Sequence, residues 1–301
     1  MASVVNSGNN ASCVGPVPNP RKPRTDVPPG ASDTHAHIFG PASRFPYIAD
    51  RSYTPPDALL NAYKELLATL GFDRAVLVQP SIYGTDNRAL LDALSRAGPN
   101  FRGICVVDDT ITNNMLEQMH ALGVRGIRGN FMNKGGITFD ALERLAWRVR
   151  PIGWHVQLFL NISEYPDFAC RVRKLPVEVV IDHMGFMPTT RGVDHPAFRE
   201  LLNLVEEDHC WVKLSGPYRI TSSIRPPYPD VRPFARSLIE ANADRLVWAT
   251  DWPHPDIHVP MPNDGDLVDI LADWVPDPTV RRKILVDNPA KLYGFPSPFA
   301  G

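Results

Sequence analysis

The run Asp33-Thr34-His35-Ala36-His37-Ile38-Phe39 places two histidines two residues apart in a short apolar segment. On a β-strand, residues i and i+2 face the same side, so both imidazoles are expected to point into one space. Two convergent imidazoles can bind a metal ion, or they can polarise a carbonyl group without one. In a chain with 9 histidines, such a pair also arises by chance as two solvated or core side chains. The meaning of the pair therefore depends on the rest of the chain.

The length and composition are those of an ordinary enzyme-sized protein. A chain of 301 residues can form one large single-core domain or two small ones. The net charge of −2 gives no reason to expect nucleic acid or a membrane surface as a partner. Residues 1–30 are rich in Pro, Asn and Ser and lack the basic start and apolar centre of a signal peptide. We therefore expect a mobile tail over residues 1–30 of a cytoplasmic protein that is a monomer or a small homo-oligomer.

Short apolar runs alternate with amphipathic stretches along the whole remaining chain. The first expected strand ends at Phe39 and is followed by expected strands at 74–79, 103–107, 124–128, 155–160, 177–182, 211–215 and 245–250. Expected helices follow these strands at 58–70, 87–97, 113–122, 138–150, 165–174, 196–207, 231–243 and 280–292.

Eight strand-then-helix units are what a (β/α)8 barrel requires. The alternative is an open doubly wound sheet, but no Gly-rich phosphate loop follows an early strand. The pattern thus predicts an α/β fold with a single (β/α)8 TIM barrel over residues 31–301, preceded by an irregular N-terminal tail.

Four polar side chains fall at the ends of the expected strands. His35 and His37 end the first strand, His183 ends the sixth and Asp251 ends the eighth. In a parallel barrel the active site lies at these carboxyl ends, so the four groups are expected to share one mouth. Taken singly, His183 could be a satisfied core histidine and Asp251 a cap of the following loop. Their coincidence with the histidine pair favours a catalytic or metal site.

Several spaced motifs make the chain resemble the amidohydrolase superfamily, in the branch of 2-pyrone-4,6-dicarboxylate lactonases and 4-sulfomuconolactone hydrolases. The matching motifs span about residues 28–295 and are Asp33-Thr34-His35-Ala36-His37, Ile181-Asp182-His183-Met184-Gly185, Ala249-Thr250-Asp251-Trp252-Pro253-His254-Pro255 and Asn288-Pro289-Ala290-Lys291-Leu292-Tyr293-Gly294. The resemblance implies hydrolytic opening of a small lactone ring. In that chemistry Asp251 is the general base towards water, and the histidines, as imidazolium donors or through a metal ion, polarise the carbonyl.

The resemblance leaves the metal content open. His35, His37, His183 and Asp251 could hold one Zn²⁺ or Mn²⁺ ion. Many members of the superfamily use a bridging lysine or glutamate to hold two metals, whereas the fifth expected strand offers only Gln157 and Phe159. The lactonases of this branch include a metal-independent enzyme. We therefore expect no obligatory metal, with a mononuclear site as the alternative.

Cations near the expected mouth indicate an anionic substrate. Arg128 ends the fourth strand, Lys134 lies in the next loop and Arg219 follows the seventh strand. Each could be an ordinary surface cation, but guanidinium groups at the catalytic face suit carboxylate or sulfonate oxygens. By resemblance, Arg128, Arg219, Tyr53 and Ser81 are substrate-contacting positions. Three substrate-side positions depart from the dicarboxylate lactonase: Lys134 replaces an arginine, Phe159 a tyrosine and Asp256 an asparagine.

An altered pocket around unchanged catalytic groups argues for a different anionic lactone. The sequence favours a sulfonated muconolactone such as 4-sulfomuconolactone over 2-pyrone-4,6-dicarboxylate. Other hypotheses are a zinc-dependent decarboxylase or a lactone isomerase of the same superfamily. A further alternative is a barrel that binds anionic small molecules without turnover, although a carboxylate such as Asp251 weakens an anion site.

Overall fold

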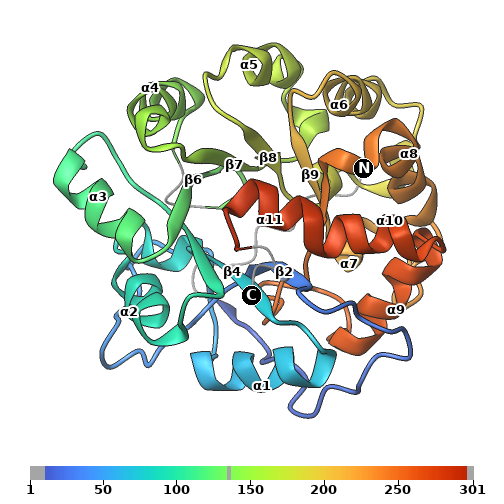
Figure 1. Ribbon diagram of the computed structural model, residues 1–301, viewed down its shortest axis with the longest axis horizontal. Helices are drawn as coiled ribbons and strands as arrows, with labels where there is room; N and C mark the ends of the chain where they lie inside the picture. Colours follow the sequence, from blue (N-terminus) through green and yellow to red (C-terminus); the bar gives the residue numbers. More distant parts are fainter. Residues whose placement is uncertain (1–10, 134–136, 297–301) are drawn as a thin grey trace.

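Eight parallel strands curl into a barrel in the computed structural model, which describes residues 11–133 and 137–296 (Figure 1). The strands are hydrogen-bonded in the order β10-β9-β8-β7-β6-β5-β4-β2. The ring closes where Asp251 N donates to His35 O at 2.9 Å and His37 N donates to Trp252 O at 2.7 Å. The barrel strands are β2 (Ser32–Ala36), β4 (Arg74–Val78), β5 (Phe101–Cys105), β6 (Val124–Asn130), β7 (His155–Phe159), β8 (Val179–Ile181), β9 (Trp211–Leu214) and β10 (Leu246–Trp248). The predicted (β/α)8 barrel is confirmed.

Most of the helices surround the barrel on its outer face (Figure 1). Their amphipathic faces supply the packing, as in α4, where Leu142, Leu145 and Val149 are buried. The helices are α1 (Leu60–Leu70), α2 (Arg88–Ala97), α3 (Asn113–Ala121), α4 (Phe139–Val149), α5 (Phe168–Lys174), α6 (Pro196–Glu206), α7 (Pro217–Ile220), α8 (Arg232–Asn242), α9 (Asp264–Trp274), α10 (Pro278–Arg282) and α11 (Asn288–Tyr293). Among residues 11–133 and 137–296, no helix has the length and apolar character needed to cross a bilayer.

Helix α9 is one element that the sequence pattern did not predict. Its N-terminus is capped by Asn263, whose side chain accepts a hydrogen bond from Gly265 N. Two aspartates, Asp264 and Asp269, are buried together with its apolar residues. Because polar and apolar residues are buried on the same helix, its buried face is not marked by apolar residues alone.

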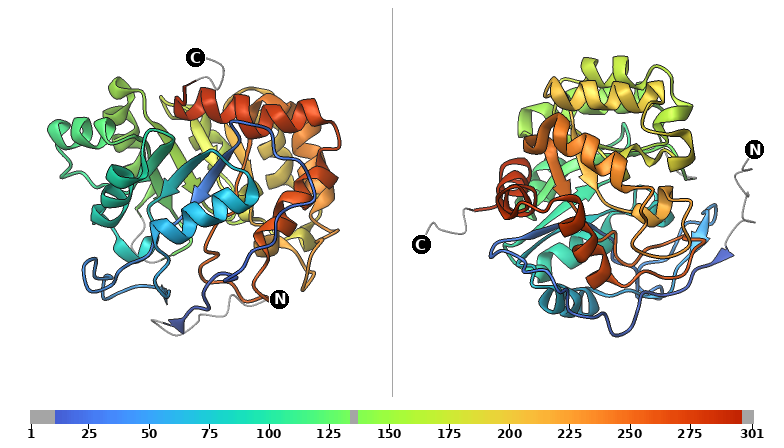
Figure 2. Two further views of the ribbon diagram at one scale, coloured as in Figure 1. Left: turned by 60° about the horizontal axis from the view of Figure 1, so that its bottom comes forward. Right: turned by 90° about the vertical axis from the view of Figure 1, so that its right-hand side faces the viewer.

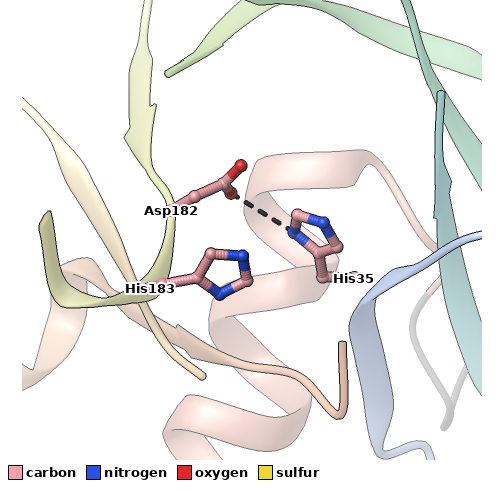
Figure 3. A group of neighbouring side chains, drawn as sticks. All are labelled: His35, Asp182 and His183. Atoms are coloured by element: carbon pink, nitrogen blue, oxygen red, sulfur yellow. Dashed lines mark ion pairs between the residues drawn. The ribbon is translucent and has the colours of Figure 1, made fainter. Parts of the chain in front are cut away.

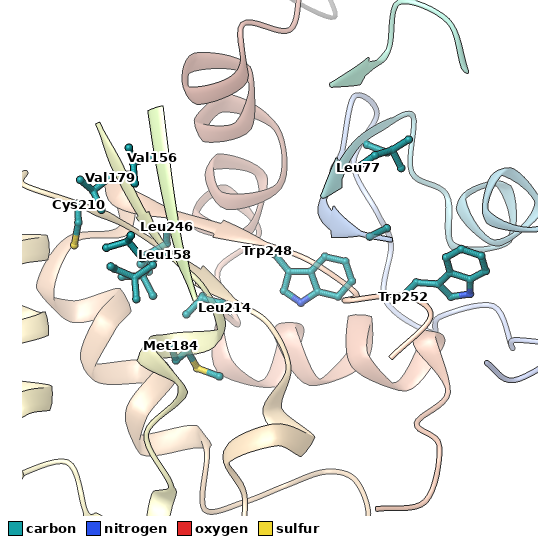
Figure 4. Close-up of a cluster of buried hydrophobic side chains, with 14 of the residues drawn as sticks. Leu77, Val156, Leu158, Val179, Met184, Cys210, Leu214, Leu246, Trp248 and Trp252 are labelled. Atoms are coloured by element: carbon teal, nitrogen blue, oxygen red, sulfur yellow. The ribbon is translucent and has the colours of Figure 1, made fainter. Parts of the chain in front are cut away.

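The core lies between the sheet and the helices, and Figure 4 shows part of it, with Leu158 and Leu246 beside Val156 and Val179 at one side and Trp248 and Trp252 towards the other. Helices α10 and α11 run across one end of the barrel (Figure 1). There Tyr293 and Phe295 pack against a buried cluster formed by Val76, Val78 and Ile104. One end of the barrel is therefore filled with apolar side chains, which leaves the opposite end for a polar site.

The segment from residue 11 to residue 30 runs along the outside of the barrel (Figure 2). Strand β1 (Ala11–Ser12) pairs in parallel with β3 (Tyr53–Thr54), and Arg21 forms ion pairs with Asp266 and Asp269 of α9. A Cβ atom on Gly265 would lie 2.3 Å from Arg21 O, so only glycine allows this close approach. The division of the chain at residue 30 stays a prediction, and residues 1–10 lie outside the described part.

Candidate active site

The four predicted groups meet at the carboxyl ends of the strands. His35 is on β2 and His37 directly follows it, whereas His183 and Asp251 lie just past β8 and β10. His183 and Asp251 adopt φ values of 51° and 67°, a left-handed conformation that side chains other than glycine rarely adopt. Such strained residues tend to cluster at functional sites. Both strained residues, His183 and Asp251, lie beyond the ends of their strands and belong to the predicted site.

Three imidazoles converge on one oxygen of Asp251. The Nε2 atoms of His35, His37 and His183 lie 3.7, 3.8 and 3.8 Å from Asp251 Oδ1. All four side chains are almost completely buried, and Oδ1 has no hydrogen-bond partner among the described residues. Buried polar atoms without partners are rare in native structures. The arrangement is therefore a polar centre in which a ligand atom can be bound.

The second oxygen of Asp251 is firmly held. Tyr218 donates its hydroxyl to Oδ2 at 2.7 Å, and Arg219 donates Nε to the same atom at 2.6 Å. The Tyr218 hydroxyl is also 2.8 Å from His254 Nδ1, and His254 Nε2 donates to Asp264 Oδ1 at 3.0 Å. This chain of contacts orients the carboxylate so that Oδ1 faces the three imidazoles.

Burial and neighbouring charges determine the protonation states at the centre. Burial lowers the pKa of His37 to about 3 and that of His183 to about 4, and it also lowers the pKa of His35 well below its ordinary value. Burial would raise the pKa of Asp251, but the charge of the adjacent Arg219 guanidinium holds it below its ordinary value. With these shifts the imidazoles are neutral and the carboxylate is ionised at neutral pH, whereas the resemblance implied imidazolium donors or a metal ion as the groups that polarise the carbonyl.

A second carboxylate, Asp182, lies behind the histidines (Figure 3). Its Oδ1 is 3.3 Å from His35 Nδ1, and it precedes His183 in the chain. The His183 ring is held from the other side by a 2.9 Å hydrogen bond between its Nδ1 and Ser215 Oγ. A Cβ atom on Gly216 would lie 2.9 Å from His183 Nδ1, so this position, with a φ of 59°, requires glycine.

The donor atoms fit a single divalent metal ion. In two groups, His35 with His37 and Asp251, and His35 with Asp182 and His183, all donor atoms lie within 4.8 Å of one another. Imidazole nitrogens and carboxylate oxygens are ordinary zinc ligands. Asp251 Oδ1 has no hydrogen-bond partner among the described residues, so a metal ion could bind this oxygen without breaking a hydrogen bond.

The predicted substrate-contacting residues are divided between the centre and its rim. Arg128 is buried, and its guanidinium donates to Gln79 O and to Asp182 Oδ2, each at 3.3 Å. Phe159 lies between two site residues, since its ring is 5.0 Å from Arg128 Cζ and 5.5 Å from the His183 ring. Arg219 is paired with Asp251 and is therefore not free for a ligand in this state.

The remaining predicted positions lie around this group. Tyr53 is buried, and this burial raises the pKa of its hydroxyl, which the nearby Ser81 and Arg128 lower in part. Asp256 is half-buried beside Cys13 of the N-terminal segment. Lys134 lies outside the described residues.

Several residues of the site were not singled out from the sequence. Gln79 and Asn130 line a small cavity together with Ser81 and Arg128. In this cavity Gln79 Oε1, Asn130 Nδ2 and Arg128 Nε have no hydrogen-bond partner among the described residues. Asn130 follows Arg128 by two positions on β6, so the strand alternation that places Arg128 inside could also have indicated Asn130.

Lys213 and Tyr218 were also not predicted. Lys213 interrupts the apolar strand Trp211-Val212-Lys213-Leu214, and a charge in such a run is a signal of a buried polar network. Tyr218 immediately precedes Arg219 in the chain, but only its contact with Asp251 reveals a role.

The buried histidines predict a loss of stability in mild acid. Burial lowers the pKa of His37 and of His155 to about 3, so at pH 5 the unfolded chain binds protons that the folded chain does not. Each should cost about 2 kcal/mol of unfolding free energy between pH 6.5 and pH 5. Burial raises the pKa of Asp33 to about 6, so this residue adds about 1 kcal/mol to the unfolding free energy over the same pH range. This gain offsets part of the loss caused by the histidines.

The measurement is the urea midpoint at pH 7 and at pH 5. His155→Gln removes one such histidine far from Asp251 and should reduce the difference between the two midpoints. An equal midpoint at both pH values would contradict the neutral assignment of the histidines.

The comparisons with known proteins show the family to which the chain belongs. The sequence model of the amidohydrolase family matches residues 32–295. The chain is 40% identical to a 2-pyrone-4,6-dicarboxylate hydrolase of Comamonas testosteroni, over 91% of this chain and 93% of the relative. It is 39% identical to a 4-sulfomuconolactone hydrolase of Hydrogenophaga intermedia, over 94% of each. A crystal structure of a probable 2-pyrone-4,6-dicarboxylic acid hydrolase from Acinetobacter baumannii with citric acid bound superposes with a TM-score of 0.78 at 28% identity, covering 88% of this chain and 100% of the other. The chain therefore belongs to the amidohydrolase family, in the branch that contains these lactone hydrolases.

Proposed function

We propose that this protein opens a small anionic lactone by hydrolysis, with Asp251 as the general base. The observation that carries the proposal is the convergence of three imidazole Nε2 atoms on the unpartnered Oδ1 of Asp251. A carboxylate oxygen without a hydrogen bond can accept a proton from water, and nearby ring N–H groups can donate to a developing oxyanion. The relatives named above are hydrolases of lactones, which supports the same reaction class.

The reaction would proceed in two proton transfers through Asp251. Water loses a proton to Oδ1 while its oxygen attacks the lactone carbonyl carbon, and the carbonyl oxygen becomes an oxyanion next to His35 and His183. The bond between the carbonyl carbon and the ring oxygen then breaks, and Asp251 returns the proton to that oxygen. The products are a carboxylate and a hydroxyl or enol group on the same carbon chain.

The anionic group of the lactone would be recognised by arginine. Arg128 lines the small cavity, its Nε has no hydrogen-bond partner among the described residues, and a charge-assisted hydrogen bond to this atom is favourable in such a buried setting. Arg219 lies at the other side of the centre and now pairs with Asp251. An anion that takes over part of the Arg219 guanidinium would weaken this pair, which raises the basicity of Asp251 when substrate is present.

A metal ion, if bound, would be held by His35, His37, His183 and Asp251 and would supply a Lewis acid that polarises the carbonyl. The chain's own residues would still position the lactone, exclude water and move the proton at Asp251. We propose that no metal is obligatory.

The finer substrate assignment rests on Phe159. Its ring contacts both Arg128 and His183 but offers no hydroxyl at the position where the dicarboxylate lactonase has tyrosine. A lost hydrogen-bond donor disfavours a ligand that needs it and leaves space for a different anion. We therefore propose 4-sulfomuconolactone as the preferred substrate, ahead of 2-pyrone-4,6-dicarboxylate.

The test is a panel of anionic and neutral lactones that includes both compounds, followed by mass spectrometry of the products. Hydrolysis of an anionic lactone gives a product heavier by one water, with one acid released per turnover. A product of unchanged mass would identify an isomerase, and CO₂ release would identify a decarboxylase. Saturable binding without any product would leave only the non-catalytic binder.

Treatment with a strong chelator should leave the hydrolysis rate within about twofold of the untreated rate, because the base and the carbonyl-polarising groups all belong to the chain. The metal content of the same samples is measured by mass spectrometry. Loss of activity on chelation that zinc restores would overturn the metal-independent version while leaving the lactonase assignment intact.

A further inference from the structure

Lys213 is a fully buried lysine on β9 whose ammonium group lies behind the histidine pair. It donates to Thr34 O at 2.9 Å and to Gln157 Oε1 at 2.8 Å. Its Nζ is also 3.3 Å from His35 Nδ1 and 3.5 Å from Asp182 Oδ1. A buried lysine is costly unless its donors are used, so these contacts define its orientation.

The contact with His35 determines which ring nitrogen carries the proton. An ammonium group has only donors, so His35 Nδ1 must accept the hydrogen bond from Lys213. Asp182 Oδ1 is equally close to Nδ1 and competes for it, but no hydrogen bond of good angle reaches this oxygen among the described residues, so the contact with Lys213 defines the role of Nδ1. In a neutral ring with Nδ1 as acceptor, the proton is on Nε2.

The partner histidine is oriented in the complementary sense. His37 Nδ1 lies 2.7 Å from the carbonyl oxygen of Val78, which can only accept, so this nitrogen carries the proton of His37. His37 Nε2 is therefore an acceptor, and it lies 3.3 Å from His35 Nε2. The hydrogen bonds then run in one direction, from Lys213 to His35, from His35 to His37 and from His37 to Val78.

We infer that Lys213 is a positioning residue that holds the proton of His35 on Nε2, so that an N–H group faces the reacting centre. This deepens the proposed function and rests on it for its catalytic meaning, because the Nε2–H of His35, which His37 Nε2 accepts in this structure, becomes the donor to the lactone oxyanion when substrate is bound. The same hydrogen bond withholds the Nε2 lone pair that a metal ion would need. Without Lys213, His35 can carry its proton on Nδ1 and donate it to Asp182. The Nε2 lone pair is then free to bind a metal ion, and the hydrogen bond to the carboxylate fixes the ring in that orientation.

The direct test is the ¹⁵N NMR spectrum of the full chain with labelled histidine, because the two ring nitrogens of a neutral imidazole have well-separated shifts. His35 is assigned by comparison with His35→Gln. We expect the Nε2–H form in the unsubstituted protein and the Nδ1–H form in Lys213→Met. An Nδ1–H form in the unsubstituted protein overturns the inference even if the variant fails to fold, and so does an unchanged Nε2–H form in the variant.

Zinc affinity supplies a second readout that does not use a lactone. Competition with a chromogenic chelator should show at least tenfold tighter zinc binding in Lys213→Met than in the unsubstituted protein, because the Nε2 lone pair is released. Equal or weaker affinity in the variant contradicts the inference. If the NMR and zinc results hold while no lactone is turned over, the proposed function fails and the role of Lys213 stands. If a lactone is hydrolysed while the unsubstituted protein carries the proton of His35 on Nδ1, the inference about Lys213 fails and the proposed function stands.

Discussion

Replacing Asp251 by asparagine should lower kcat for lactone hydrolysis by about 10³-fold or more, because the side chain loses its ability to take a proton from water. The shape of the side chain is nearly unchanged, so the barrel should remain folded. Arg219 loses its internal counter-ion in this variant, since its Nε now bonds Asp251 Oδ2 at 2.6 Å. The variant should therefore bind the anionic lactone as tightly as the unsubstituted protein or more tightly, which separates loss of chemistry from loss of binding.

The measurements are steady-state kinetics and the dissociation constant of the lactone under single-turnover conditions. Asp109→Asn is a matched control, because Asp109 is an exposed carboxylate that pairs with Arg144 at 2.7 Å on the outer surface. It should have unchanged kinetics. Turnover of Asp251→Asn within tenfold of the unsubstituted rate would exclude this carboxylate as the base.

Replacing Arg128 by methionine should lower kcat/KM by about 10- to 150-fold, mainly through KM. A charge-assisted hydrogen bond to a buried anion is worth about 1.5–3 kcal/mol, and Arg128 offers an unpartnered Nε next to the cavity with Asn130. Arg128 also neutralises Asp182, so the unfolding free energy should fall by about 3 kcal/mol. Kinetics at 15 °C and a urea titration of the same preparation distinguish the two effects.

Arg102→Met is the control for the loss of a buried arginine. Arg102 is also buried, but it donates to the carbonyl oxygens of Tyr293 and Gly294, where α11 ends. It should lose stability with no change in KM. A KM of Arg128→Met that is equal to that of the Arg102 variant would show that Arg128 only supports the fold.

The neutral state of the three histidines alters how the oxyanion would be stabilised. A neutral imidazole donates one N–H, and the direction of that N–H depends on what its other nitrogen contacts. His183 has Ser215 at Nδ1, His37 has the carbonyl oxygen of Val78, and His35 has Lys213. These three neighbours, which contact the Nδ1 atoms of the rings, thus determine which histidines can donate a hydrogen bond to the lactone.

The barrel itself could be predicted from the sequence because its strands are short apolar runs separated by amphipathic helices. Every barrel strand lies within a few residues of its expected place, including β6 and β7. Helix α9 could not be predicted in this way, since it buries Asp264 and Asp269 along with its leucines. Asp269 pairs with Arg21, which lies 248 positions earlier, and Asp264 accepts from His254 in the loop before the helix.

The sequence by itself determined the order of the strands and which side chains end them, because strand alternation and the parallel barrel place strand-end residues at one mouth. His35, His37, His183 and Asp251 follow from that rule alone. Only the tertiary structure decided which oxygen of Asp251 is left unpartnered, that Arg219 pairs with this carboxylate, and that Lys213 lies behind His35. These are contacts of 2.6–3.3 Å between residues that are 32 or 178 positions apart. Hydrogen bonds at such distances depend on orientation, and no local pattern in the sequence specifies the orientation of side chains from different strands.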